Sequence, residues 1–157
     1  MKTLVIGLGN PILGDDGVGW RVVEEIARKT ADRNDIEVDT VSLGGLSLME
    51  RITGYGRVIL VDSFFTGIKP IGTVSMFPLT ELPELSSGHT TAIHDTSLRN
   101  ALNVGRSMDI SLPWDEDVLI VAIEAENVFD FSEILSPQVE AAVPQAVEAV
   151  LQLIESK

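Results

Sequence analysis

The sequence contains no cysteine, only two histidines and few basic residues, and each shortage excludes a class of protein. Without cysteine the chain can form no disulfide bond, no thiolate metal site and no thiol nucleophile. Its 11 lysine and arginine residues stand against 24 acidic residues, which leaves a net charge of −13 at pH 7. A surface this acidic repels phosphate backbones and anionic lipid headgroups. We therefore expect no nucleic-acid partner and no membrane partner.

Long hydrophobic runs are also absent. No apolar stretch reaches the roughly 18 residues that a membrane-spanning helix needs. The apolar segment TLVIG near the N-terminus is followed within a few residues by glycine, asparagine and proline, and then by Asp15 and Asp16. A secretory signal does not have this pattern. These features predict a cytoplasmic protein. The 157 residues, of which 45% are hydrophobic, predict one α/β domain over residues 1–157.

Short β-branched segments alternate with amphipathic segments, which is typical of an α/β fold. The predicted strands are Thr3–Gly7, Ile36–Ser42, Arg57–Asp62, Gly72–Phe77 and Asp117–Ile123. The predicted helices are Asp16 to about Thr30, Leu46–Ile52, Ala92–Val104 and a last helix that opens at Ser136 and Pro137. We therefore predict three layers, with helices on both faces of a twisted, mostly parallel five-stranded sheet. The short link after the third strand predicts that one edge strand is antiparallel.

Two further segments carry structural expectations. Pro144 lies inside the pattern of the last helix, where it removes a backbone donor and predicts a kink or a restart. The polar stretch from about Leu79 to Thr91 is rich in serine and proline, and it predicts a loop near the functional site.

The glycine-rich segment Gly7–Gly19 joins the first strand to the first helix and is the most informative part of the chain. A dinucleotide-binding turn would need G-x-G-x-x-G, but Ile12 stands where the third glycine belongs. Asp15 and Asp16 place negative charge where a pyrophosphate would lie, so a nucleotide-binding α/β protein is a disfavoured alternative. One acid is enough to cap the helix, which leaves the role of the second unexplained.

Two more residues complete a candidate site. Asp62 follows the aliphatic run Val58–Val61, at the end of a strand where α/β proteins bind ligands, although acids also begin ordinary loops there. His94 stands at a predicted helix start, where the helix dipole disfavours the protonated imidazole. A lone histidine is more often structural, and His89 in the preceding polar segment is interpreted as solvated. Only the combination of residues therefore points to a function.

Asp16, Asp62 and His94 lie at three strand–helix junctions that can converge on one edge of the sheet. Two carboxylates and one imidazole suit a divalent ion such as nickel, zinc or iron(II) that keeps open coordination positions. The set does not suit a closed structural zinc site, which would use cysteine or more histidine. The motifs H-E-x-x-H of zincins and G-x-S-x-G of serine hydrolases are absent.

Four segments, taken in order, resemble the hydrogenase maturation endopeptidases. They are GLGNPILGDDGVG, GYGRVILVDSF, IHDTSLRNAL and LSPQVEAAVPQAVEAVL, and together they cover nearly the whole chain. The resemblance implies a five-stranded twisted sheet between helices. It also implies an aspartyl-type endopeptidase that removes the C-terminal extension of a [NiFe]-hydrogenase large-subunit precursor after nickel insertion. The partner is then that precursor, and the protein itself is expected to be a monomer or a weak homodimer.

The resemblance also implies roles for the site residues. Asp16, Asp62 and His94 match the family positions that contact the metal and carry the activity. The nickel belongs to the substrate, so this protein is not expected to need a resident metal, although other divalent ions can occupy the site. Recognition would then depend on the metal rather than on the sequence around the cut.

The chain departs from the family pattern at two places. Some members have Asp-Gly-Gly after the second strand, where this chain has Leu43-Gly44-Gly45, and Asp39 lies four residues too early to replace that acid. The second acid of the glycine-rich turn is glutamate in some members, whereas Asp16 has a shorter side chain. The missing acid keeps a second hypothesis open, a non-catalytic metal-sensing module for hydrogenase assembly.

Overall fold

The computed structural model describes residues 2–42, 44–82 and 93–156, with side chains in the last segment described from Leu98 onward. Five strands form a single sheet in the order β2-β1-β3-β5-β4. The strands are β1 (Thr3–Leu8), β2 (Ile36–Val41), β3 (Arg57–Phe64), β4 (Val74–Pro78) and β5 (Val118–Glu124). All neighbouring pairs are parallel except β4 with β5, which is antiparallel at one edge. The predicted mostly parallel sheet with one antiparallel edge strand is confirmed.

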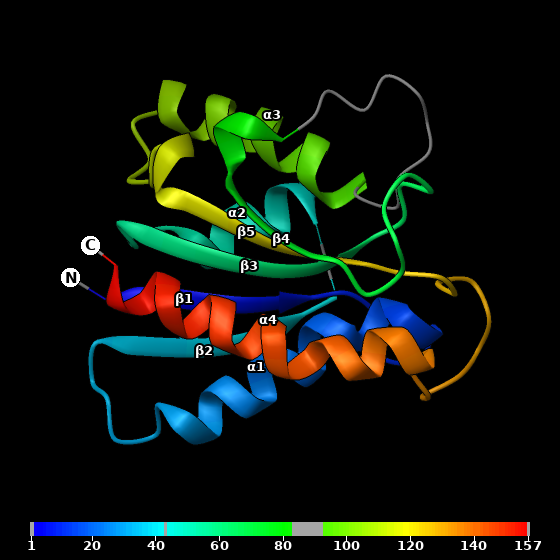
Figure 1. Cartoon of the computed structure of the whole chain (residues 1–157). Helices are drawn as coiled ribbons and strands as arrows, with labels where there is room; N and C mark the ends of the chain where they lie inside the picture. Colours follow the sequence, from blue (N-terminus) through cyan, green and yellow to red (C-terminus); the bar gives the residue numbers. More distant parts are fainter. Residues whose placement is uncertain (1, 43, 83–92, 157) are drawn as a thin grey trace.

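Helices cover both faces of this sheet, as Figure 1 shows. The helix α1 (Val18–Lys29) packs with α4 (Pro137–Glu155) on one face. On the other face α2 (Gly45–Ile52) packs with α3 (Ile93–Ser107). The predicted three-layer α/β arrangement is therefore confirmed. In the described part of the chain, no helix combines the length and the apolar character needed to cross a membrane.

The core is divided into two layers by the alternation of side chains along each strand. In β1, Leu4, Ile6 and Leu8 point to the side of α2 and α3, whereas Val5 points to the side of α1 and α4. All four side chains are fully buried. A central strand covered on both faces must be apolar at consecutive positions, and for this reason the short runs in β1 and β3 are aliphatic throughout.

Two predicted helix features differ from the structure. The first helix begins at Val18 rather than at Asp16, because Gly14–Gly17 form a separate 3-10 turn, η1, that carries both acids. The last helix, α4, is continuous through Pro144, so the predicted restart is wrong. Pro144 lies on the exposed side of α4, where water can satisfy the carbonyl that loses its backbone donor.

The predicted loop from about Leu79 to Thr91 is only partly described. Its first residues, Leu79–Glu81, form a short 3-10 turn in which Leu79 is fully buried. Residues 83–92 lie outside the described part, so its expected place beside the site is not tested.

Close packing of two glycines places α1 directly against the ends of the central strands. A Cβ on Gly19 would lie 2.4 Å from the carbonyl oxygen of Val61, and one on Gly7 would lie 2.5 Å from the carbonyl oxygen of Gly19. A side chain at either position would push the start of α1 away from β1 and β3. Because β1, β3 and β5 are parallel, the loops that follow them gather at one end of the sheet, on the right in Figure 1.

A charged cluster joins α2 to the edge strand β2 and gives a testable pH dependence. Arg51 donates to Asp39 at 2.7 Å and to Glu37 at 3.0 Å, and the Tyr55 hydroxyl donates to Glu37 at 2.5 Å. The hydrogen bond from Tyr55, followed by that from Arg51, lowers the pKa of the Glu37 carboxyl. A depressed folded-state pKa stabilises the protein above the unfolded value of about 4.3, and this contribution is lost as the pH falls through the folded pKa.

Replacing Tyr55 with phenylalanine should therefore lower the free energy of unfolding by about 0.5–1 kcal/mol at pH 7, a modest value because the pair is only part-buried. The difference between the wild type and Tyr55→Phe should shrink below pH 4 and vanish once Glu37 is protonated in both. Urea unfolding at several pH values measures this. A difference that stays constant down to about pH 2 would show that the hydrogen bond to the carboxylate is not responsible.

Candidate active site

Asp16 contacts Ser63, the residue that follows Asp62, near the carboxyl end of β3. The Ser63 hydroxyl donates to Oδ1 of Asp16 at 3.1 Å, and the Ser63 backbone N–H donates to Oδ1 of Asp62 at 2.8 Å. These residues are 47 and 46 positions from Asp16 in the sequence, so the contact is made by the fold. These contacts place Asp16 beside the Asp62–Ser63 step of β3. That the two carboxylates face one site stays a prediction.

The local backbone aims the Asp16 carboxylate at this edge. The chain turns sharply after β1 at Gly9, where φ is +129° and a Cβ would lie 1.9 Å from the carbonyl oxygen of Asp16. This position therefore needs glycine. The turn brings the backbone N–H of Asn10 within 2.8 Å of Oδ2 of Asp16. Both oxygens of this carboxylate thus accept a hydrogen bond, which fixes its orientation.

The two acids differ in exposure. Asp62 is 2% exposed and Ser63 is 1% exposed, whereas Asp16 is only half-buried. An approaching molecule therefore reaches Asp16 before Asp62. Carboxylate oxygens held in fixed positions at a strand end can contact a divalent cation or accept a proton from water.

Asp15 has a different role from that of its neighbour. Its side chain is fully buried and accepts four hydrogen bonds from residues more than 100 positions away in the sequence. The donors are the backbone N–H groups of Glu126 (3.0 Å), Asn127 (2.9 Å) and Ser136 (2.6 Å), and the Ser136 hydroxyl (2.8 Å). Asp15 thus joins η1 to both ends of the loop between β5 and α4.

This arrangement corrects the expectation that one of the paired acids caps the first helix. The N-cap residue of α1 is Gly17, and no side chain makes a cap hydrogen bond there. The Asp15 carboxylate instead lies at the start of α4, where Ser136 is the N-cap residue. Ser136 does open this helix as predicted, but its hydroxyl donates to Asp15 and not to the helix backbone.

The third predicted site residue is only partly described. His94 lies in the first turn of α3, as predicted, but its side chain is outside the described part, as are His89 and Leu43. The described side chains contain no group of three or more metal-ligating residues. A site formed by Asp16, Asp62 and His94 together therefore stays a prediction.

Two polar residues at this end of the sheet are missed by the sequence argument. One is Ser63, whose hydroxyl donates to Asp16. The other is Glu124, 3% exposed at the end of β5, which accepts from Thr66 N–H (2.9 Å), Thr66 Oγ1 (2.6 Å) and Gly67 N–H (3.3 Å). It fixes the loop after β3. The sequence did contain a signal for Glu124, because this acid directly follows the apolar run Val118–Ile123. The same kind of position made Asp62 a candidate.

Asp39 does not take the place of the acid that is absent from Leu43-Gly44-Gly45. It lies within β2 and pairs with Arg51 at 2.7 Å, in the cluster that holds α2. This agrees with the expectation that Asp39 lies too early in the chain to substitute.

Comparisons with known proteins agree with this description of the fold. A family model described as "Hydrogenase maturation protease" matches residues 20–153. The hydrogenase expression/formation protein HupD of Rhizobium leguminosarum is 23% identical over 155 residues, which cover 99% of this chain and 75% of that protein. The hydrogenase 2 maturation protease of Escherichia coli is 24% identical over 151 residues, which cover 96% of this chain and 89% of that protein.

Solved structures show the same fold. The hydrogenase maturating endopeptidase HybD of E. coli superposes with a TM-score of 0.79 at 24% identity, covering 98% of this chain and 92% of that one. The [NiFe] hydrogenase maturation protease HybD of Thermococcus kodakarensis gives a TM-score of 0.74 at 24% identity, covering 98% and 99% of the two chains. The five-stranded sheet with its antiparallel edge strand therefore corresponds to a known arrangement.

Proposed function

This chain belongs to the hydrogenase maturation protease family, and from that premise we propose that it removes the C-terminal extension of a [NiFe]-hydrogenase large-subunit precursor after nickel insertion. The observation that supports this proposal most directly is the contact of Asp16 with Ser63, which places one candidate acid next to the chain neighbour of the other, Asp62. Two carboxylates in fixed orientation are suited both to contact a cation and to take up a proton.

In this proposal the nickel is part of the substrate. Asp16, Asp62 and His94 would contact the ion that the precursor already carries, and this contact would hold the scissile peptide beside the site. Other divalent ions can occupy the same donors. Because Asp16 is half-buried and Asp62 is almost fully buried, Asp16 is the first of the two that the precursor meets.

The chemical step is hydrolysis of one peptide bond. A carboxylate of the site accepts a proton from the attacking water, the oxygen adds to the carbonyl carbon, and the C–N bond breaks. The leaving amine takes up a proton, and the products are a new carboxyl terminus and a released peptide. Nickel carried by the precursor would polarise the carbonyl of the scissile peptide bond. The reaction would then depend on prior metal insertion.

A second candidate function is a metal-sensing module that inspects the precursor without cutting it. The observation that favours it is Leu43, which stands where some family members have an acid implicated in activity. The two functions predict the same binding partner, and only one of them changes the mass of that partner.

Incubation of the full chain with nickel-loaded and nickel-free precursor separates the hypotheses. We expect mass spectrometry to show the loss of a C-terminal peptide from the nickel-loaded precursor alone. The Asp62→Ala variant, for which we expect no activity, serves as the matched control for contaminating proteases. Equal cutting of both precursors would contradict recognition by metal, and an intact precursor in both samples would favour the sensing module.

A further inference from the structure

The loop between β5 and α4, residues 125–135, exposes large apolar side chains. Phe129 is 69% exposed, Phe131 is 85% exposed and Ile134 is 78% exposed. Side chains of this size are usually buried, and several of them gathered on one loop typically mark a surface that binds another protein. We refer to Phe129, Phe131 and Ile134 as the loop apolar surface.

The loop that carries this surface is firmly anchored. Asp15 accepts hydrogen bonds from Glu126 and Asn127 at its start and from Ser136 directly after its end. Its middle is held by Ser132, which donates to the carbonyl of Ile12 at 2.9 Å and accepts from the N–H of Gly14 at 2.7 Å. The loop apolar surface is thus exposed by a defined backbone, which lowers the entropic cost of binding a partner.

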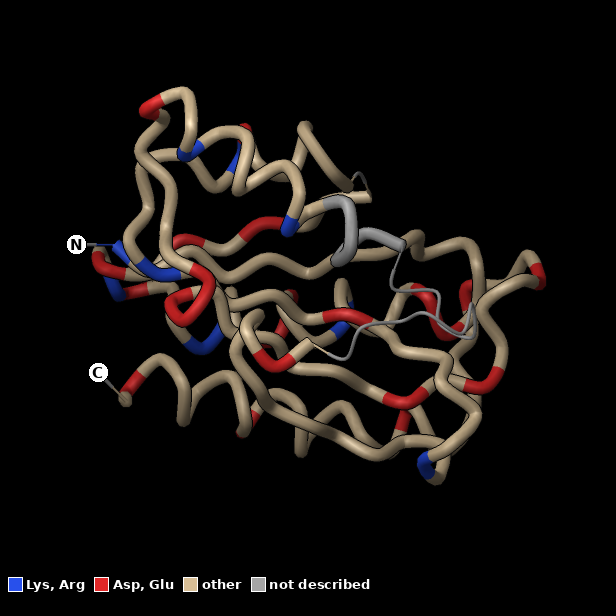
Figure 2. Tube along the Cα trace, turned by 90° about the horizontal axis from the view of Figure 1, so that it is seen from above, with Lys and Arg blue, Asp and Glu red and all other residues tan. Residues whose placement is uncertain are grey.

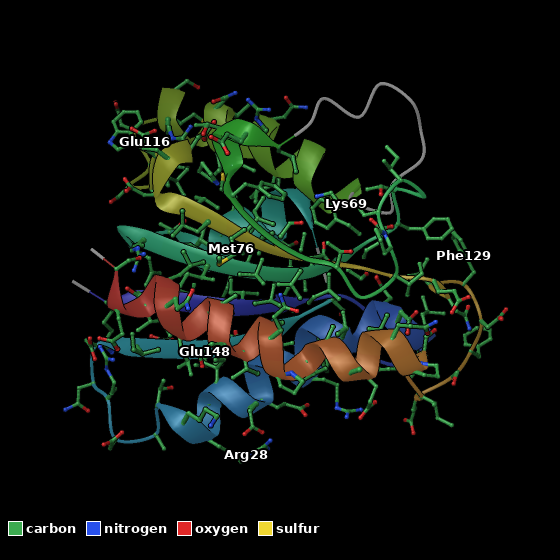
Figure 3. All side chains as sticks on the ribbon, viewed as in Figure 1. Arg28, Lys69, Met76, Glu116, Phe129 and Glu148 are labelled. Carbon is green, nitrogen blue, oxygen red and sulfur yellow. The ribbon has the colours of Figure 1, made fainter. Side chains whose placement is uncertain are left out.

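Buried side chains anchor the same loop. Val128 is 4% exposed and Leu135 is 5% exposed, so the loop buries some of its apolar residues and presents others. The ring of Phe129 packs edge-on against Phe65 in the loop after β3, with centroids 6.1 Å apart at 87°. In Figure 3, Phe129 lies at the end of the molecule where the carboxyl ends of β1, β3 and β5 are found, and Glu116 lies at the opposite end.

The loop apolar surface adjoins the candidate active site. The residue that clamps the loop, Asp15, is the sequence neighbour of Asp16, and both lie in the short turn η1. The loop is also bonded to Ile12 and Gly14, so it lies beside the turn that carries Asp16. A partner bound there would lie at a fixed position relative to the two carboxylates.

Charge indicates the chemistry of the partner. Glu126, Asp130 and Glu133 alternate with the apolar residues of the loop and are exposed. After Arg106 the sequence contains a single basic residue, the C-terminal Lys157. Figure 2 shows acidic positions around this end of the molecule. A complementary partner presents apolar side chains bordered by lysine or arginine.

We propose that the loop apolar surface is the docking site for the large-subunit precursor, whose contact patch carries apolar side chains bordered by basic residues. This inference rests on the proposed function, because it identifies the protein substrate as the occupant. Phe129 and Phe131 enter the partner's apolar surface, and the acids around them pair with its basic residues. The anchored loop then presents the precursor's C-terminal segment to Asp16 and Asp62.

The test compares steady-state processing by the wild type, Phe131→Ser and Phe129→Ser/Phe131→Ser over a range of precursor concentrations. Loss of two aromatic anchors should raise KM about 30-fold and leave kcat little changed, because the reacting groups are untouched. Phe131→Ser is included because its side chain is 85% exposed and its loss should not affect folding. The matched control, Val104→Ser/Met108→Ser, removes two exposed apolar side chains from the end of α3 and should keep the wild-type KM.

The outcomes are distinguishable from failure of the proposed function. If the wild type does not cut the precursor, the proposed function fails. Docking is then tested by the Kd for the same precursor, which biolayer interferometry measures. A KM or Kd that is unchanged in the double phenylalanine variant overturns the docking proposal. It is also overturned if light scattering shows a wild-type dimer that this variant converts to a monomer, since the occupant is then a second copy of the chain.

Discussion

Replacing Asp16 with asparagine should reduce precursor processing by at least about 100-fold while leaving the protein folded. The asparagine side chain has the same shape, and its oxygen can still accept from the backbone N–H of Asn10, which donates to Asp16 at 2.8 Å. Its amide nitrogen can donate to the hydroxyl oxygen of Ser63, which reverses the present hydrogen bond. The substitution therefore removes the negative charge with little change in geometry.

The measurement is the rate of C-terminal peptide release from the nickel-loaded precursor, with circular dichroism and thermal unfolding as checks of the fold. The matched control is Asp109→Asn, because Asp109 has a positive φ of 60° that asparagine also tolerates, and it lies just beyond α3. This control should process at the wild-type rate. Wild-type activity in Asp16→Asn would show that the charge of Asp16 has no part in the reaction. Corresponding losses are expected for Asp62→Ala and His94→Ala.

Replacing Asp15 with alanine should lower the free energy of unfolding by about 3–5 kcal/mol, the largest stability effect expected for a single acid in the glycine-rich turn. The Asp15 carboxylate is fully buried and accepts hydrogen bonds from Glu126, Asn127 and Ser136. Alanine would leave these donors buried without their acceptor, and each unsatisfied donor costs about 1–3 kcal/mol. The start of α4 would also lose the negative charge that its dipole favours.

Urea unfolding of Asp15→Ala against the wild type measures this loss. Glu126→Ala is a matched control in the same loop, because the Glu126 side chain is exposed and only its backbone N–H contacts Asp15. The control should change the free energy of unfolding by no more than about 0.5 kcal/mol. Equal stability of both variants would contradict the clamping role of Asp15. Hydrogen exchange in residues 125–135 should increase in Asp15→Ala alone, since its anchor is lost.

Periodicity and turn residues predicted the strands and most of the helices because these depend on local composition. The aliphatic run Val58–Val61 needs cover on both faces, and this requirement alone makes β3 a central strand. Asp62 was predicted to end this strand, but β3 continues to Phe64, so Asp62 lies within it and pairs with Ala122 of β5. The predicted restart at Pro144 did not occur, because Pro144 lies on the exposed side of α4 and the packed face of the helix runs on through this position.

The sequence by itself determined the α/β class and the antiparallel edge strand, since apolar runs and short links are properties of neighbouring residues. The family resemblance selected Asp16 rather than Asp15, and only the tertiary structure showed the physical reason for the difference. Asp16 bonds to Ser63, whereas Asp15 turns inward to Ser136, 121 residues away. The two carboxylates are chemically identical, so their roles differ only through the partners that chain folding brings to each one.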